Sequence, residues 1–502
     1  MRVVCSKRII LFSAVVLSAA LLLLTNHFFS RPRVLAVSEV PITFWAWRTQ
    51  APTNDEVQKV FMAMNAKTLF LRAGQFDAAD GSVRRIRSMS GAMPSSVEIH
   101  LVYNGTRKLL RELERFEANE VARVVADTYR SDLSRAANEN VEVRGLQLDL
   151  DVPTRLLPRY GQILRHVREM LPSDAALSIT GLPTWADTNE IGDVLNAVDF
   201  WIPQCYGANI PTHITERISI SSPKEVERTI AKIRKLEKPF YAGLSAYSYA
   251  ILYDKNGDLI ELRGDIDPSA ASMHKDLELA ATQTFKGDAR TSQIRREYQA
   301  KSDFVLDGLV IHAGETLVFD LPTAASLRAS AKAVRENAGE SLLGICVFRI
   351  PTAEDRTTLS LEEITSALTD RETQASTNIK LETNSDQRLR IVAENTGNAG
   401  SALTIDLEIP AGSVSGVHGL SGFDNYEPLC SGAGKSPLPC SARRANIVRL
   451  NASVWTPGAS AWTKLNVTKP LPASIPASVT TRINDGRVEK KSYEIKIQNR
   501  GD

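Results

Sequence analysis

Apolar and polar positions follow two alternating patterns along most of this chain. From Ile42 onward, short runs rich in β-branched and aromatic residues are followed by longer stretches whose apolar residues recur at helical spacing. In the segment 156–171, for example, Tyr160, Ile163 and Val167 fall on one helical face. Strands are predicted at 42–47, 68–72, 97–103, 145–151, 176–182, 198–206, 240–247 and 343–350. Helices are predicted between them at 54–66, 118–137, 156–171 and 223–236.

This order of elements indicates an α/β fold in which the strands close into a (β/α)8 barrel, the TIM barrel, over residues 40–372. An open, doubly wound sheet is the alternative. That fold would be favoured by a glycine-rich phosphate-binding turn after the first strand, and the sequence has none there. We therefore expect the closed barrel.

One interval, about 250–341, interrupts the repeat between the seventh and eighth predicted strands. The run Asp254-Lys-Asn-Gly-Asp258 lies between two apolar stretches and predicts a hairpin turn. A strand-like stretch at 304–319 and a helix at 324–337 complete the insertion. Because loops that follow barrel strands gather at the C-terminal mouth of the barrel, we expect a small subdomain beside that mouth.

The pattern changes again beyond residue 373. Short strand candidates separated by Asn, Gly, Ser and Pro replace the helices, which is typical of an all-β sandwich. We expect this C-terminal domain to span 376–502, with 469–476 as a Pro-rich connector. Its strands are predicted at 377–383, 388–394, 402–409, 445–451, 461–467 and 493–498.

The N-terminal segment 1–33 differs from the rest of the chain. Arg2, Lys7 and Arg8 precede an uncharged, mostly apolar run at 9–30, which is long enough to cross a bilayer. A cleaved signal peptide, and hence a secreted protein, is the alternative, although no small-residue cleavage site follows the run. We expect an inner-membrane anchor, with the folded domains in the periplasm or outside the cell.

Two cysteines agree with a location outside the cytoplasm. Cys430 and Cys440 bracket a loop rich in Gly, Ser and Pro and predict a local disulfide, which requires an oxidising compartment. Neither has a second Cys pair or a His cluster at metal-ligand spacing, so we expect no metal site, and we expect no cofactor. The formal net charge of +2, without a basic stripe, argues against a nucleic-acid partner.

The sharpest local signal is Arg144-Gly-Leu-Gln-Leu-Asp-Leu-Asp151, on the fourth predicted strand. Alternation along a strand places Gln147, Asp149 and Asp151 on one face. At the C-terminal end of a barrel strand that face meets water and ligand, and two neighbouring carboxyl groups have separated pKa values, as acid–base catalysis requires. The alternative is that these acids pair with Arg or Lys and hold a loop.

This segment resembles the D-G-x-D-x-D-x-E signature of glycoside hydrolase family 18, the chitinase group, whose fold is also a (β/α)8 barrel. Gly145, Asp149 and the apolar alternation match the signature. Arg144 and Gln147 stand where the family has its first two acids, and Asp151 stands where it has its acidic Glu.

The sixth predicted strand carries a second partial match, because Gln204-Cys-Tyr-Gly207 lies where that family has Met-x-Tyr-Asp. Tyr206 is retained and the Asp is replaced by Gly207. The whole run from Phe44-Trp-Ala-Trp47 to the segment that ends at Trp185 is most similar to a bacterial group named domain of unknown function 3142, which is itself similar to glycoside hydrolase family 18.

The resemblance implies roles for three residues. Asp151 would protonate the glycosidic oxygen, and Asp149 would orient an N-acetyl group of the substrate that acts as internal nucleophile. Tyr206 would hydrogen-bond the acetyl oxygen. A direct mechanism with two carboxylates, the second on another strand, remains the alternative.

Polar and aromatic residues at other strand ends are candidates for substrate binding. Aromatic rings suit the apolar faces of sugars, and polar side chains can bond hydroxyl groups. For the aromatic residues core packing is the alternative, and for the polar ones it is a bond to a carboxylate. The candidates are Trp47, Arg72, Asn104, Gln147, Trp185 and Gln204.

Three functions are consistent with these features. The first is a glycoside hydrolase that acts on an envelope or extracellular polysaccharide, with N-acetylhexosamine as a candidate unit. The second is a carbohydrate-binding protein on a barrel that has lost its activity, which the replaced acids favour. The third is a structural scaffold of the envelope, which would need no ligand.

Overall fold

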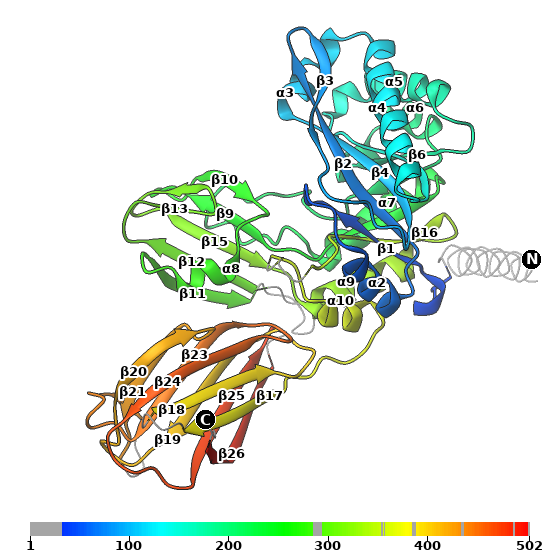
Figure 1. Ribbon diagram of the computed structural model, residues 1–502. Coiled ribbons are helices and arrows are strands. Elements are labelled where there is room, and N and C mark those ends of the chain that lie inside the picture. The colour runs from blue at the N-terminus through cyan, green and yellow to red at the C-terminus, as the bar shows by residue number, and fades with distance from the viewer. Residues whose placement is uncertain are drawn as a thin grey trace, which may run out of the picture.

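The computed structural model describes residues 33–284, 294–352, 355, 357–383, 388–432, 436–484 and 487–499. Three parts are visible in Figure 1: a barrel ringed by helices, a smaller sheet inserted beside it, and an all-β domain at the C-terminus. The predicted N-terminal anchor lies outside the described residues. Within them, no helix is long and apolar enough to span a bilayer.

The barrel contains all eight strands that the sequence predicts. Every neighbouring pair is parallel, and pairing of β1 with both β2 and β16 closes the sheet. The closed α/β barrel is therefore confirmed. Its strands are β1 (Ile42–Ala46), β2 (Thr68–Ala79), β4 (Glu98–Gly105), β5 (Val143–Asp149), β6 (Ala176–Gly181), β7 (Phe200–Pro203), β8 (Phe240–Ser245) and β16 (Leu342–Phe348).

Strand alternation decides which side chains fill the barrel. On β2, Leu69 and Leu71 pack outward with the helices, whereas Phe70 faces inward against Trp45 and Val102. Aromatic rings dominate this interior, and the Trp45 and Phe70 ring centroids lie 6.3 Å apart. The interior is therefore closely packed, with a few buried polar side chains such as Gln147 and Ser178 among the rings.

The helices cover the outside of the barrel. Several begin with a side-chain cap, as at Thr53, whose hydroxyl accepts from the Glu56 amide while Glu56 bonds back to the Thr53 amide. The helix at 324–337, which the sequence assigned to the insertion, packs into the barrel core through Leu327 and Val334. The helices are α2 (Asn54–Met64), α3 (Arg107–Glu112), α4 (Ala118–Asn138), α5 (Leu157–Met170), α6 (Ile191–Asn196), α7 (Pro223–Ile233), α9 (Ala324–Asn337) and α10 (Leu361–Leu368).

The insertion after β8 forms an antiparallel sheet with its own apolar core. The predicted turn at 254–258 joins β9 to β10, and the stretch at 304–319 divides into three short strands rather than one. The first inserted strand, β9, follows directly on the end of β8, which places this sheet beside the barrel mouth (Figure 1). Its elements are β9 (Tyr249–Tyr253), β10 (Leu259–Arg263), α8 (Pro268–Met273), β11 (Leu277–Thr284), β12 (Ile294–Ala300), β13 (Phe304–Leu306), β14 (Leu309–Ile311) and β15 (Thr316–Leu321).

The C-terminal strands fold over a single core to which both halves of the sheet contribute, which agrees with the predicted all-β sandwich. Cys430 and Cys440 form a disulfide with their Cα atoms 5.8 Å apart. The strands are β17 (Thr377–Thr383), β18 (Arg388–Asn395), β19 (Ser401–Glu408), β20 (Val414–Ser421), β21 (Asn425–Cys430), β22 (Leu438–Pro439), β23 (Ile447–Trp455), β24 (Ser460–Val467), β25 (Ser474–Ile483) and β26 (Val488–Asn499).

Buried polar contacts join this domain to the other two parts. The carboxylate of Glu363, on α10, accepts a hydrogen bond from the Gly400 amide at 2.8 Å. Arg296, on β12 of the insertion, donates to the Ser453 carbonyl. The C-terminal domain is thus tied to both the barrel and the insertion.

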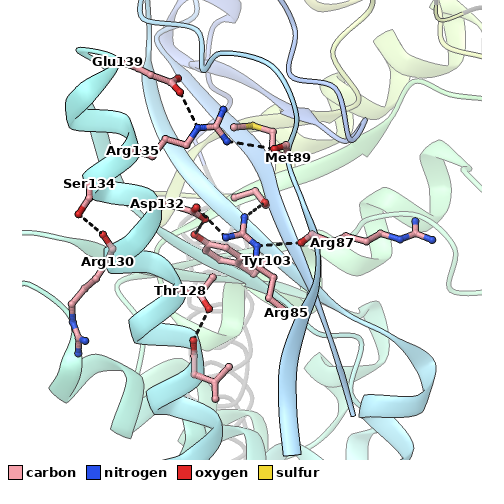
Figure 2. Close-up of polar contacts among 12 residues, drawn as sticks. Arg85, Arg87, Met89, Tyr103, Thr128, Arg130, Asp132, Ser134, Arg135 and Glu139 are labelled. Atoms are coloured by element: carbon pink, nitrogen blue, oxygen red, sulfur yellow. Dashed lines mark hydrogen bonds and ion pairs between the residues drawn. The ribbon is translucent and has the colours of Figure 1, made fainter. Parts of the chain in front are cut away.

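A hairpin not predicted from the sequence rises from the barrel, where β2 continues past its neighbours and pairs with β3 (Ser82–Ser88). Arg85 ties this hairpin to α4, because its guanidinium donates to Asp132 at 3.0 Å and to the Ala73 carbonyl at 2.5 Å. The Tyr103 hydroxyl donates to the other oxygen of Asp132 at 2.7 Å. Figure 2 shows Asp132 between the two donors. The hairpin is therefore anchored by a buried charge network.

We expect Asp132→Asn to lower the free energy of unfolding by about 3 kcal/mol, because the little-exposed Arg85 would lose its counter-charge. Asp127→Asn on the same helix breaks an exposed ion pair with Arg130 and should cost less than about 1 kcal/mol. Urea denaturation of both variants measures the difference. Equal losses would show that the network does not anchor the hairpin.

Candidate active site

The candidate site lies at the C-terminal mouth of the barrel. β5 ends at Asp149, two residues before the strand end that the sequence predicted. Asp151 therefore stands on the following loop and not on the strand. Asp149 still faces inward, since Gln147 two residues earlier is fully buried inside the barrel. The two carboxyl groups thus lie at the rim, one half-buried and one exposed.

Asp149 is held in an environment that favours its protonated form. Burial and the neighbouring charge of Asp151 raise its pKa to about 7, against the opposing effects of a hydrogen bond from Thr180 and the charge of Arg72. The Thr180 hydroxyl lies 2.5 Å from the Asp149 carboxylate. At neutral pH the protonated and ionised forms of this carboxyl group are therefore both populated.

Asp151 is exposed at the rim, yet the surrounding protein displaces enough water to raise its pKa as well. The Gln204 amide donates to it at 3.4 Å, a bond that favours the ionised form. Within the part of the chain that the structure describes, neither Asp149 nor Asp151 forms an ion pair with Arg or Lys. The alternative, in which the two acids pair with Arg or Lys and hold a loop, is therefore not supported by the described residues.

A cluster of aromatic rings lies beside the carboxyl pair, centred on Phe348 at the end of β16. The Phe348 ring is half-buried, and its centroid lies 5.5 Å from that of Trp47, 5.0 Å from Tyr247 and 6.4 Å from Tyr206. Burial raises the pKa of Tyr206, and the charges of Asp149 and Asp151 lie close enough to add to this rise. These rings form an apolar wall for the mouth.

Sequence reasoning singled out Trp47 and Tyr206 but missed Phe348 and Tyr247. Both missed residues fall within the last few positions of predicted strands, at 343–350 and 240–247. Counting back by twos from each predicted strand end would have found Phe348, because it shares the inward phase of Cys346. Tyr247 lies past the end of β8, where strand phase gives no guidance.

Arg72, Asn104 and Trp47 form a second group on the neighbouring strands. The Arg72 Nε donates to the Asn104 Oδ1 at 3.2 Å, and its guanidinium lies over the Trp47 ring, 5.1 Å from the centroid. Asn104 pairs with Asp149 across β4 and β5. The structure therefore brings these three predicted residues to the same rim as the acids.

Two predicted substrate-binding residues lie away from the rim. Gln147 is fully buried, where its amide oxygen accepts from the Trp45 indole at 2.7 Å. Trp185 is also fully buried, packs against Tyr160 and donates to the Val152 carbonyl at 3.1 Å. Neither exposes surface to a ligand, because core packing prevailed at both positions.

A pocket of about 400 Å³ opens next to the aromatic cluster, between the end of β1 and the end of β16. Trp47 lines it together with Arg349 and Asp355, whose side chains form an ion pair at 2.6 Å. Across the described ranges, no group of three His, Cys, Asp or Glu side chains is placed to hold a metal ion. The mouth therefore offers carboxyl groups, amides, guanidinium groups and aromatic rings.

The fold defined by these elements is a (β/α)8 or TIM barrel, with a carboxyl pair at its C-terminal mouth. Residues 111–284, which include Asp149, Asp151 and Tyr206, match the family model described as Domain of unknown function (DUF3142). This match confirms the resemblance to that group. No curated protein is similar enough in sequence to count as a match.

Three solved structures each align with 66% of this chain. The Bacillus cereus spore cortex-lytic enzyme SleL is 15% identical, with 74% of its chain covered and a TM-score of 0.40. A chitinase from Chromobacterium violaceum is 12% identical, with 98% covered and a TM-score of 0.41. The GH18 chitinase ChiB from Flavobacterium johnsoniae is 12% identical, with 94% covered and a TM-score of 0.40. Because the identities and TM-scores are this low, the chemistry of the site is argued from the geometry of this chain alone.

Because the pKa of Asp149 is about 7 in the folded protein and about 3.9 in an unfolded chain, the folded state binds more protons between these values. Stability conferred by Asp149 protonation is therefore lost as the pH rises through about 7. We expect Asp149→Asn to have a free energy of unfolding that is higher than that of the native chain at pH 8, by on the order of 2 kcal/mol. At pH 4.5 the two free energies of unfolding should differ little.

Denaturation at the two pH values measures this difference. Asp187→Asn is the matched control, because Asp187 is half-exposed and paired with Lys232 at 2.6 Å. Its effect should not grow with pH. A gap between Asp149→Asn and the native chain that is independent of pH would contradict a raised pKa.

Proposed function

We propose that this protein is a glycoside hydrolase that acts on an envelope or extracellular polysaccharide by carboxylate acid–base catalysis. The observation that carries the proposal is the pair Asp149 and Asp151, which shares the barrel rim without a cationic partner among the described residues. Two adjacent acids of unequal pKa can hold one proton at neutral pH, and such a proton is what cleavage of a glycosidic bond requires.

Asp151 is the member placed to donate to the substrate, because it is the more exposed of the two. Burial raises the pKa of Asp151 against the opposing bond from Gln204, so this carboxyl group can carry the proton that the substrate receives. We infer that protonated Asp151 donates to the glycosidic oxygen as the glycosidic bond breaks. In its ionised form, Asp149 is the neighbouring charge that stabilises the positive charge developing on the sugar.

The aromatic cluster supports a sugar substrate. Phe348, Trp47 and Tyr247 present rings of the kind that pack against the C–H faces of a pyranose. Tyr206 lies near both acids, where its hydroxyl can donate to an acetyl oxygen. For this reason N-acetylhexosamine is our candidate unit, with its acetamido oxygen as the internal nucleophile.

We expect Asp149→Asn and Asp151→Asn each to reduce turnover by at least about 100-fold, because each removes a member of the proton-carrying pair. The assay measures new reducing ends released from purified envelope polysaccharides and from N-acetylhexosamine oligomers. Asp187→Asn, which lies after β6 and outside the pair, should retain full activity. Full turnover in both rim variants would end the proposal.

The competing function is a carbohydrate-binding protein without activity, favoured by the Arg144 and Gln147 that replace family acids. It predicts saturable glycan binding by the native chain, no product, and no change of affinity in Asp151→Asn. The same set of proteins tested for binding and for turnover therefore separates the two functions.

We also propose that residues 9–30 anchor the chain in the inner membrane, so that the folded domains face the periplasm or the outside of the cell. Their apolar sequence and the Cys430–Cys440 disulfide support this location. The full chain should sediment with membranes and be released only by detergent, whereas a chain lacking residues 1–33 should stay in the supernatant. A full chain recovered from the supernatant would contradict the anchor.

A further inference from the structure

The guanidinium of Arg72 lies at the rim, where Asp149 is the nearby acid whose charge acts on it. Arg72 faces the mouth, because it is two residues from the inward-facing Phe70 on β2. It is only half-buried, and no carboxylate lies within ion-pair distance of it among the residues that the structure describes. Because this guanidinium has no carboxylate at ion-pair distance in the free protein, the carboxylate of a bound ligand would be stabilised there.

The donors of Arg72 are oriented but largely unused. Of the five N–H groups of a guanidinium, one bonds Asn104 at 3.2 Å and one bonds the Trp47 carbonyl at 3.4 Å. The Trp47 ring supports the flat face of the group, which fixes its plane. The remaining donors therefore form a preorganised fork, the geometry that carboxylates accept in pairs.

The surrounding charges also favour an anion on this side of the mouth. Arg87, on β3, pairs with Gln75 of β2. Burial and then the charge of Arg87 lower the pKa of Arg72, against the opposing charge of Asp149. Figure 2 shows the Arg87 side chain extending from the hairpin on the side opposite α4. The nearby carboxylate of Asp355 is already bound by Arg349 at 2.6 Å. Positive charge thus gathers at β2 and β3, while the acids stand at β5.

We propose that Arg72 binds the carboxylate of an acidic sugar, with Arg87 as a second cation, so that the substrate is an anionic polysaccharide. This inference rests on the proposed function and specifies its substrate class. Asn104 links the two halves of the site, because it bonds Arg72 and pairs with Asp149 on the next strand. A uronic acid bound by Arg72 would therefore place the neighbouring sugar over Phe348 and within reach of the carboxyl pair.

The test compares acidic oligosaccharides with neutral ones of the same backbone. The probes are tetrasaccharides of hyaluronan, chondroitin and heparosan, each beside its carboxyl-reduced form, in which the uronic acid has become a neutral sugar. Dissociation constants are measured calorimetrically with Asp151→Asn, so that no probe is consumed. We expect the acidic member of at least one pair to bind about tenfold tighter or better than its neutral form.

Arg72→Gln in the same background should abolish this preference, while Arg72→Lys, which keeps the charge but loses the fork, should retain part of it. Arg84→Gln is the matched control, since Arg84 lies near the tip of the same hairpin in an exposed pair with Asp80. It should leave the preference unchanged. Thermal melting of each variant verifies that it is folded.

Three outcomes would overturn the inference: no binding of any acidic probe, equal binding of both members of every pair, or a preference that survives in Arg72→Gln. The proposed hydrolase is judged separately, by product formation with the native acids. Preference for acidic probes without product supports the anion site and contradicts the hydrolase. Product formation with equal binding of acidic and neutral forms does the reverse.

Discussion

Burial of two neighbouring carboxyl groups, at the end of β5 and on the loop after it, is the constraint on which the rest of the site depends. Asp149 and Asp151 cannot both be ionised cheaply in a partly desolvated rim, and the bonds from Thr180 and Gln204 offset only part of the cost. A barrel tolerates such a pair because its closed sheet and packed interior are stable without help from the rim. Because the ionised form of Asp149 is destabilised, its carboxyl group keeps a proton up to a pH of about 7.

Alternation along the strands separates the residues that build the barrel from those that act at its mouth. On β5, Gln147 accepts a hydrogen bond from the Trp45 indole inside the barrel. Asp149, two residues further along the strand, is partly exposed to solvent. On β16, Cys346 packs inside while Phe348 reaches the rim. Packing and chemistry are thus only two residues apart on the same strand. A register shift of one residue on either strand would exchange them with positions that face the helices.

The barrel was predictable because its strands and helices follow periodic patterns of apolar residues. The site was predictable only in part, because contacts between residues distant in sequence leave no such pattern. Apolar runs separated by amphipathic helices predicted the strands, and strand phase predicted the inward direction of Asp149. Tertiary packing then withdrew Trp185 and Gln147 into the interior, which no local pattern distinguishes from the rim. The strand β25 escaped prediction because Pro476 was read as part of a connector, although proline is tolerated where its missing N–H is not needed. The hairpin strand β3 is mostly polar and lacks the apolar run by which strands were recognised.

The hairpin formed by β2 and β3 has a consequence for how such proteins can diversify. Its root is fastened to α4 through Arg85 and Asp132, on the outside of the barrel, rather than through any residue of the carboxyl pair. Its tip is an exposed turn at Asp80 and Gly81, where length and composition can change at little cost. Mutations at this turn can change the surface that the hairpin presents while Asp149, Asp151 and their hydrogen bonds stay as they are. The tip of the hairpin can therefore diverge between related chains independently of the carboxyl pair.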